Sequence, residues 1–291
     1  MTLIIEAIVL GILTGSVYAL MSSGLTLIFG VMNIVNVAQG ILVILGAYLT
    51  YAVGKYLHID MFVSLLLTMP AMFLLGVGIE WAFVRRLKKE HVGLSILVMF
   101  AVALIIEGAL DLIFSASYVS LEAAYLTASF PVLGFHLGYV YIFTFLMSLL
   151  LLALLYLLVY QTKFGHGLRA SIQDRTAAAL VGIDVEKVQT LTFGIGVALA
   201  AAGGMAYGAT ISFNASSAYD LISRLLVIIV LGGMGSLRGA FVASIAMLII
   251  GDVTAVLWSP VWSSTVFNIL LMALLIFRPQ GLFGQIEGRK Q

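Results

Sequence analysis

The sequence predicts an all-α protein, a polytopic transmembrane helical bundle, because it is very apolar and poor in charge. Hydrophobic residues make up 63% of the 291-residue chain and charged residues only 9%, and the mean hydropathy is +1.18. A soluble domain carries about 25% charged residues. Apolar stretches of about 20 residues, the length that crosses roughly 30 Å of hydrocarbon, recur along nearly the whole chain. We therefore expect residues 1–291 to form a single transmembrane domain with about eight to nine spans.

The candidate spans follow one another closely along the chain. They cover residues 4–29, 37–53, 61–84, 94–115, 139–160, 188–212, 221–231, 240–257 and 264–277. The segment at 221–231 is too short to cross a bilayer alone. The amino terminus lacks the positive n-region of a signal peptide and its apolar run is too long for one, so we expect the first span to be retained.

Basic residues gather in alternate connections, and this pattern predicts the orientation. The basic residues of these connections are Arg85, Arg86, Lys88 and Lys89, then Lys163, Arg169, Arg175 and Lys187, then Arg238, and finally Arg278, Arg289 and Lys290. The connections near residues 58–60, 115–138 and 214–220 hold no lysine or arginine. Cytoplasmic loops carry the excess of basic residues. We therefore predict an amino terminus outside the cell membrane and a carboxyl terminus in the cytoplasm.

Small residues at four-residue spacing predict closely packed helices. Gly11 and Gly15 form one such pair, and Ala200, Gly204 and Gly208 form a longer ridge. Small side chains let helix backbones approach where lipid offers no hydrophobic drive to association. These positions are interpreted as structural.

The charged connection at residues 162–187 contains a short helix signal. Asp174 suits an N-cap because its carboxylate can accept from the unpaired first-turn amides. Residues 176–181 are mostly helix formers, and Gly182 can take the left-handed conformation that ends a helix. Such a capped helix between two spans is a rigid projection at the membrane surface, and another protein can bind and move it. The alternative is a plain connecting loop anchored by its basic residues.

Two segments have the pattern of broken helices. Residues 24–40 place Asn33, Asn36 and Gln39 among apolar neighbours, and residues 231–240 place Ser236 after a glycine-rich break. Amide side chains in hydrocarbon are costly unless they are paired or face an aqueous path. Paired irregular segments in the two halves of a chain point to a translocation pathway. The alternative is that these residues only cap and join helices.

Few ionisable residues were expected inside the spans, namely Glu80, Glu107, Asp111 and Asp252. Glu107 and Asp111 stand four residues apart, hence on one helix face, as a proton relay requires. Counted from residue 94, however, they fall toward the outer boundary, which favours interfacial or structural roles.

Signatures of catalysis are absent from the sequence. It has no GxxxxGK[ST] phosphate loop, no nucleophile motif, no set of His, Asp and Glu at metal-ligand spacing, and no cysteine. We expect no enzyme activity, no metal and no cofactor in this chain.

Four segments resemble the branched-chain amino acid ABC importer permeases of the LivH type. They are SGLTLIFGVMNIVNVAQG at 23–40, the loop at 162–187 with GLRA and AAALVGID, LGGMGSLRGAFV at 231–242, and FRPQGLFG at 277–284. The resemblance covers essentially the whole chain, with these segments in the expected order. One departure is Gln39, where many members carry histidine, so the resemblance lends no support to proton handling at this position.

The resemblance implies a coupling helix at residues 174–182 that sits in a cleft of a partner ATPase. The residues expected to take part are Gly167, Arg169, Asp174, Arg175, Ala178, Gly182 and Ile183. The implied partners are a second homologous permease, two cytoplasmic ATPases that bind ATP and Mg²⁺, and a periplasmic binding protein. The implied location is the bacterial inner membrane.

The implied function is import of leucine, isoleucine and valine. Other substrates within the same importer class are urea, short amides and other amino acids. The alternative from a different class is a stand-alone secondary transporter or channel that uses Glu107 and Asp111. Nothing in the sequence selects the substrate.

Overall fold

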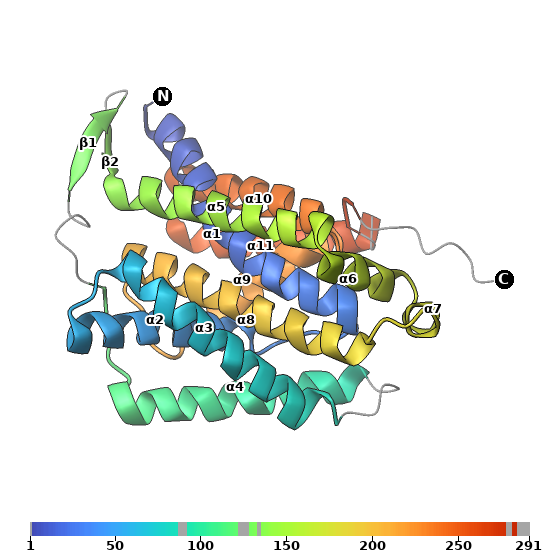
Figure 1. The fold of residues 1–291 in the computed structure, drawn as a ribbon. Helices are drawn as coiled ribbons and strands as arrows, with labels where there is room; N and C mark the ends of the chain where they lie inside the picture. Colours follow the sequence, from blue (N-terminus) through green and yellow to red (C-terminus); the bar gives the residue numbers. More distant parts are fainter. Residues whose placement is uncertain (1, 87–91, 122–127, 133–134, 278–280, 284–291) are drawn as a thin grey trace.

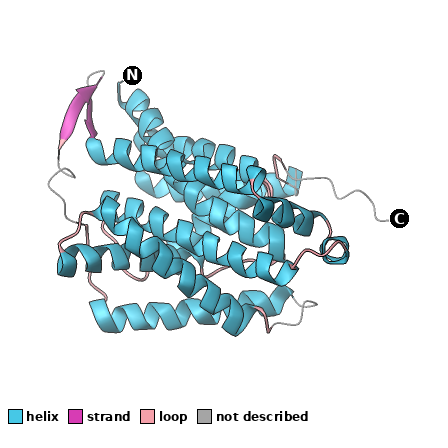
Figure 2. Ribbon diagram, in the orientation of Figure 1, coloured by secondary structure: helices cyan, strands magenta, loops and turns pink. Residues whose placement is uncertain are grey.

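The computed structural model describes residues 2–86, 92–121, 128–132, 135–277 and 281–283. The described part is almost entirely helical (Figure 2). Its elements in order are α1 (Thr2–Met32), α2 (Gln39–Leu57), α3 (Met61–Ile79), the π-helical turn η1 (Glu80–Val84), α4 (Val92–Phe114), strands β1 (Ser129–Val132) and β2 (Phe135–Gly138), α5 (Tyr139–Gln161), α6 (Lys163–Gln173), α7 (Arg175–Leu180), α8 (Val185–Thr210), α9 (Ser217–Gly232), α10 (Leu237–Leu257) and α11 (Pro260–Phe277).

The predicted polytopic bundle is confirmed. Seven described helices are long and apolar enough to cross a membrane, namely α1, α2, α3 together with η1, α4, α5, α8 and α10. In Figure 1 the long helices lie side by side, with the antiparallel β1–β2 hairpin at one end and α7 at the other. The α9 helix has only 16 residues, in agreement with the short segment expected at 221–231.

The α8 helix forms the centre of the bundle. Inside the protein, 83% of its apolar window is buried, against 17% for α4. The sequence of α8 explains this position, because its many Gly and Ala residues let α1, α2 and α3 approach closely. Outer helices instead expose large apolar side chains such as Leu66, Leu112 and Leu150, which gives the bundle a lipid-compatible surface.

Glycines set the closest contacts between the helices. A Cβ added at Gly11 would lie 2.7 Å from the Cα of Ile249 in α10, and one at Gly204 would lie 2.0 Å from the carbonyl oxygen of Val43 in α2. The small-residue spacing in the sequence therefore marks real contacts, between α1 and α10 and between α8 and α2.

Two helices begin inside the bundle rather than at its end. After α1, residues 33–38 return so that Gln39, the first residue of α2, reaches Gly196 near the middle of α8. After α8, residues 211–216 return in the same way to the start of α9. The two starts meet, because a Cβ at Gly40 would lie 2.4 Å from the carbonyl oxygen of Ala218. Each of two long helices is thus followed by a break and a helix that starts at depth, as in membrane transporters with discontinuous helices.

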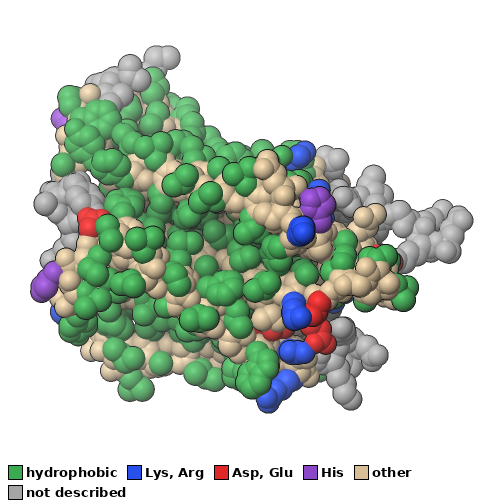
Figure 3. Space-filling model, in the orientation of Figure 1, with side chains coloured by type: hydrophobic (Ala, Val, Ile, Leu, Met, Phe, Trp, Pro, Cys, Tyr) green, Lys and Arg blue, Asp and Glu red, His purple; other side chains and the backbone are tan. Residues whose placement is uncertain are grey.

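The two ends of the bundle differ in charge. Lysine and arginine gather at the α7 end (Figure 3), where Arg169 and Arg238 both lie over the ring of Tyr160. The first turn of α1 lies at the hairpin end (Figure 1). The last described residues lie at the α7 end, since the Leu282 amide donates to the carbonyl of Leu231 at 2.8 Å. Lys88, Lys89, Arg278, Arg289 and Lys290 lie outside the described residues.

The sequence analysis omitted one helix and two basic residues. The connection at 162–187 holds two helices, because Thr162 caps α6 by accepting from the Gly165 amide at 3.0 Å. Lys55 and Arg224 were missing from the predicted inventory of basic residues, and Arg224 lies within α9.

We predict that Gly204→Ala destabilises the bundle, since the added methyl must push α8 from the Val43 carbonyl. Overpacking of this kind costs about 1–3 kcal/mol. Gly108→Ala is the matched control, because nothing lies within 4 Å of its Cβ position. The measurement is thermal unfolding of the detergent-purified chain. Equal melting temperatures for the two variants would contradict the close α2–α8 contact.

Candidate functional site

The α7 helix is a short capped projection at the basic end of the bundle. The Asp174 Oδ1 accepts from the amides of Thr176 at 2.8 Å and Ala177 at 3.0 Å, as predicted for an N-cap. Gly182 has φ +87°, the left-handed conformation expected of a helix terminator. The Ile183 amide donates to the carbonyl of Ala178 at 3.1 Å and closes the end of the helix. Both predicted boundary signals of α7 are therefore present.

The tip of α7 presents apolar side chains to the outside. Leu180 is 83% exposed and Val181 is 77% exposed, whereas Ala178 is buried. This tip lies beyond the long helices at the right-hand end of Figure 1. An apolar, rigid tip on a polar membrane surface is suited to binding another protein.

Arg175 links α7 to the last turn of α1. Its Nη2 donates to the carbonyl oxygen of Val31, and burial lowers the pKa of the guanidinium. Val31 stands two residues before Asn33, which has φ +53° and ends α1. Arg175 therefore connects α7 to the turn of α1 that precedes the break at residues 33–38.

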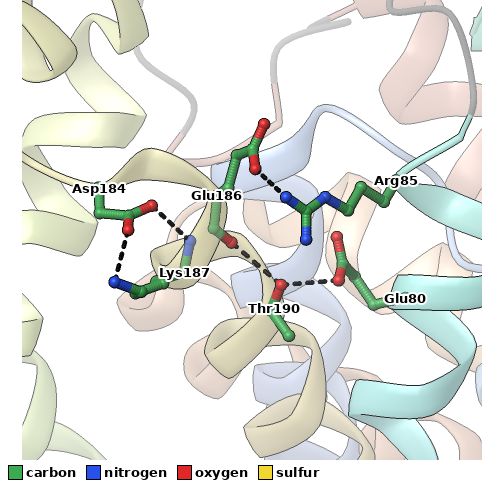
Figure 4. A network of polar contacts seen from close by, with 6 residues as sticks. All are labelled: Glu80, Arg85, Asp184, Glu186, Lys187 and Thr190. Atoms are coloured by element: carbon green, nitrogen blue, oxygen red, sulfur yellow. Dashed lines mark hydrogen bonds and ion pairs between the residues drawn. The ribbon is translucent and has the colours of Figure 1, made fainter.

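A polar network fixes the start of α8 beside α7 (Figure 4). The Thr190 hydroxyl donates to buried Glu80 at 2.7 Å, and Arg85 pairs with Glu186. The Lys187 ammonium lies 2.9 Å from Asp184, and this hydrogen bond lowers the pKa of the Asp184 carboxyl. These contacts join η1 to α8, so the linker after α7 leads into an anchored helix.

Asn36 and Gln39 form a buried amide cluster at the depth where α2 begins. The Asn36 Nδ2 donates to the Gln39 Oε1 at 3.0 Å, and the Gln39 Nε2 donates to the carbonyl oxygen of Gly196 at 3.3 Å. Both side chains are fully buried, and the Asn36 Oδ1 has no hydrogen-bond partner among the described residues. The cluster ties the break to the middle of α8.

The four predicted pathway residues do not form one group. Asn33 is exposed and ends α1, while Ser236 caps α10 by accepting from the Gly239 amide at 3.1 Å. Ser236 follows Gly235, which lies against Gly30 in the last turns of α1, whereas Gln39 lies against Gly24. These levels differ by about 9 Å along α1. Lining of a pathway by these residues stays a prediction.

The predicted coupling residues group around α7 with one exception. Gly167 in α6 faces Ile183, because a Cβ there would lie 3.5 Å from the Ile183 Cγ2. Arg169, in contrast, is exposed on α6, with its guanidinium carbon 5.1 Å from the centre of the Tyr160 ring. A role in coupling stays a prediction for the whole set.

Glu107 is paired with a tyrosine rather than set up as a relay with Asp111. The Tyr219 hydroxyl donates to the Glu107 Oε2 at 2.5 Å, and Asp111 is exposed. The sequence analysis missed a different charged group, the pair of Asp220 and Arg224 in α9. A basic residue within the apolar run at 221–231 was the available signal.

The comparisons with known proteins identify the family. A family model described as "Branched-chain amino acid transport system / permease component" matches residues 7–276. The chain belongs to this family. The family is one of transport permeases and not of enzymes, and its membership agrees with the multi-span fold.

Curated relatives cover nearly the whole permease. A probable branched-chain amino acid transport permease protein LivH of Methanocaldococcus jannaschii is 30% identical, over 94% of this chain and 90% of its own. The BraD permease of a high-affinity branched-chain amino acid transport system in Pseudomonas aeruginosa is 26% identical, over 98% and 97%. The LivH permease of Escherichia coli is 27% identical, over 96% and 95%. No solved structure matches the chain at a significant level.

We predict that Gln39→Leu destabilises the permease, because it leaves the Asn36 amide and the Gly196 carbonyl without their partner. A buried polar group left unpaired costs about 1–3 kcal/mol. The matched control is Gln173→Leu, at an exposed position at the end of α6. Thermal unfolding in detergent measures both variants. An unchanged melting temperature for Gln39→Leu would show that the cluster does not hold the break together.

Proposed function

We propose that this chain is the permease subunit of an ATP-binding-cassette importer that carries leucine, isoleucine and valine across a bacterial inner membrane. Family membership supports the permease role, and the printed names of the LivH and BraD relatives support the substrate class. The observation that carries the proposal is α7, a capped helix with an exposed apolar tip that is hydrogen-bonded to the end of α1.

In this proposal α7 is the coupling helix. The tip formed by Leu180 and Val181 docks in a cleft of a cytoplasmic ATPase. When the ATPase dimer closes on ATP, α7 moves with it. Arg175 transmits the movement to the Val31 carbonyl, and the short linker through Gly182 transmits it to α8.

The same movement reaches the middle of the bundle. The end of α1 leads through residues 33–38 to the Asn36–Gln39 cluster, and this cluster is bonded to Gly196 of α8. Moving α1 relative to α8 therefore changes the place where the first turns of α2 and α9 meet. We propose that this change switches the pathway between outward and inward access.

The proposed partners follow from the family. A second, homologous permease completes the membrane core, and part of this chain is itself similar to a relative named LivM, 26% identical over 213 residues. Two ATPases supply the energy and bind ATP and Mg²⁺, while this chain binds no cofactor. A periplasmic binding protein delivers the solute. The hairpin end faces the periplasm and the α7 end the cytoplasm, in line with the basic residues.

Reconstitution into liposomes tests this function. We predict that uptake of leucine needs this chain, the second permease, both ATPases, internal ATP and an external binding protein, and that it persists when the proton gradient is collapsed. Uptake should persist because ATP hydrolysis, and not an ion gradient, supplies the energy for transport. Urea and short amides serve as competing solutes with the same components.

Two outcomes would contradict the proposal. Accumulation of an amino acid by the purified chain alone, in response to a proton or sodium gradient, would identify a secondary transporter instead. ATP-dependent uptake of urea or an amide without uptake of any branched-chain amino acid would retain the importer and reject the substrate.

A further inference from the structure

A cavity of about 120 Å³ lies between α1, α5, α8, α9 and α10, away from the amide cluster. It has room for several water molecules. Its walls combine three kinds of side chain: two opposite charges, six hydroxyl groups and three aliphatic groups. Tyr141 near the start of α5 and Thr210 at the end of α8 place it toward the hairpin end.

The two charges come from different helices. Arg224 of α9 holds Asp220 at 2.9 Å through its Nε and approaches the Ser264 hydroxyl at 3.4 Å through its Nη2. A guanidinium has five N–H donors, so further donors remain for a ligand. Asp252 of α10 also lines the cavity, and among the described residues none donates a hydrogen bond to its carboxylate. Ionisable groups within membrane-spanning segments are costly and mark functional sites in membrane proteins.

The tyrosine hydroxyls in the wall are also unused. Tyr18 and Tyr207 are 7% and 9% exposed, and neither hydroxyl has a hydrogen-bond partner in the described part of the chain. A buried tyrosine hydroxyl normally finds a partner. The threonines differ, because Thr14 donates to its own helix at Leu10 and Thr210 does so at Ala206. Hydroxyls and a carboxylate that make no hydrogen bond among the described residues, all facing one cavity, indicate a polar ligand.

We propose that this cavity is a binding site for the zwitterionic head of an α-amino acid with an aliphatic side chain. This inference rests on the proposed function. Arg224 binds the ligand carboxylate through its free N–H groups, and Asp252 with the Tyr18 hydroxyl binds the ammonium group. The side chain lies against Val17, Ile211 and Leu248.

The arrangement discriminates against other solutes. A ligand without an ammonium group leaves the Asp252 carboxylate without a partner, and one without a carboxylate leaves the Arg224 donors unused. Loss of one partner from a buried charge pair weakens binding at least about tenfold. Urea and short amides carry no net charge at either end, so they gain little from this site.

Direct binding tests the site. The assembled complex of this chain, the second permease and the ATPases is placed in nanodiscs without binding protein and titrated with radiolabelled leucine. We expect competition by unlabelled leucine, and at least about tenfold weaker competition by 4-methylpentanoate and by isopentylamine. We expect Asp252→Asn to weaken leucine binding by a similar factor. Glu6→Gln, which removes a carboxylate of α1 outside the cavity, is the matched control and should bind normally.

A second measurement locates the ligand without depending on those variants. The chain has no cysteine, so Ile211→Cys supplies a single thiol at the cavity, where Ile211 is 53% exposed. Leucine should slow the reaction of this thiol with a small water-soluble reagent, and 4-methylpentanoate should not. The same protection at Leu180→Cys, on the α7 tip, is not expected.

The outcomes separate this site from the proposed function. ATP-dependent leucine uptake with normal binding in Asp252→Asn and no protection at Ile211→Cys would overturn the site and leave the importer standing. Absence of leucine binding by the parental complex at millimolar concentration would also overturn it. Protection at Ile211→Cys by another zwitterionic amino acid, without uptake of leucine, would support the site and reject the proposed substrate.

Discussion

A helix that begins inside a bilayer must have its free backbone groups and side chains satisfied by other parts of the protein, and this constraint governs the whole structure. The first break is held by Asn36, Gln39 and the Gly196 carbonyl. The second is held by Asn214, whose Oδ1 accepts from the Ser217 amide at 3.1 Å and from two serine hydroxyls at 2.9 Å. Glycine-rich contacts of α8 bring these breaks together, because no bulkier residue at Gly204 would allow the α2 backbone so near.

The α7 end is joined to the membrane interior through Arg175 and through the start of α8. Arg175 of α7 donates to the Val31 carbonyl of α1, and only the short break separates Val31 from the amide cluster. On the other side, α7 continues into α8, which the Glu80 and Arg85 contacts fix to η1 and the residue after it. The α7 helix is therefore connected to two long helices of the bundle, α1 and α8. The proposed amino-acid cavity lies between α1, α5, α8, α9 and α10, toward the hairpin end and away from the amide cluster.

Much of the fold was predictable because hydrophobic length and small-residue spacing are local signals. The cap at Asp174, the terminator at Gly182 and the contacts of Gly11 and Gly204 were all visible in the sequence and are confirmed. The depth at which α2 and α9 begin was not visible, because it depends on contacts between distant segments such as Gln39 with Gly196. From the sequence we predicted that the break near Asn36 has its counterpart in the glycines before Ser236. In the structure, the counterpart is the break before Ala218, because the start of α9 contacts the start of α2 at Gly40. Arg224 was missed because it stands within an apolar run. Its ion pair with Asp220, about one helix turn earlier, appears only in the structure.

The link from α7 through Arg175 to the break is the central claim, and a distance measurement tests it most directly. Spin labels are attached to Tyr56→Cys on α2 and Val261→Cys on α11, two exposed positions in a chain without native cysteine. The distance between them is measured in the assembled importer before and after ATP is trapped in the ATPases. A shift is expected in the parental chain and in the control Arg86→Gln, and it should be lost in Arg175→Gln although the ATPases remain bound. The same shift in Arg175→Gln as in the parental chain would contradict the link.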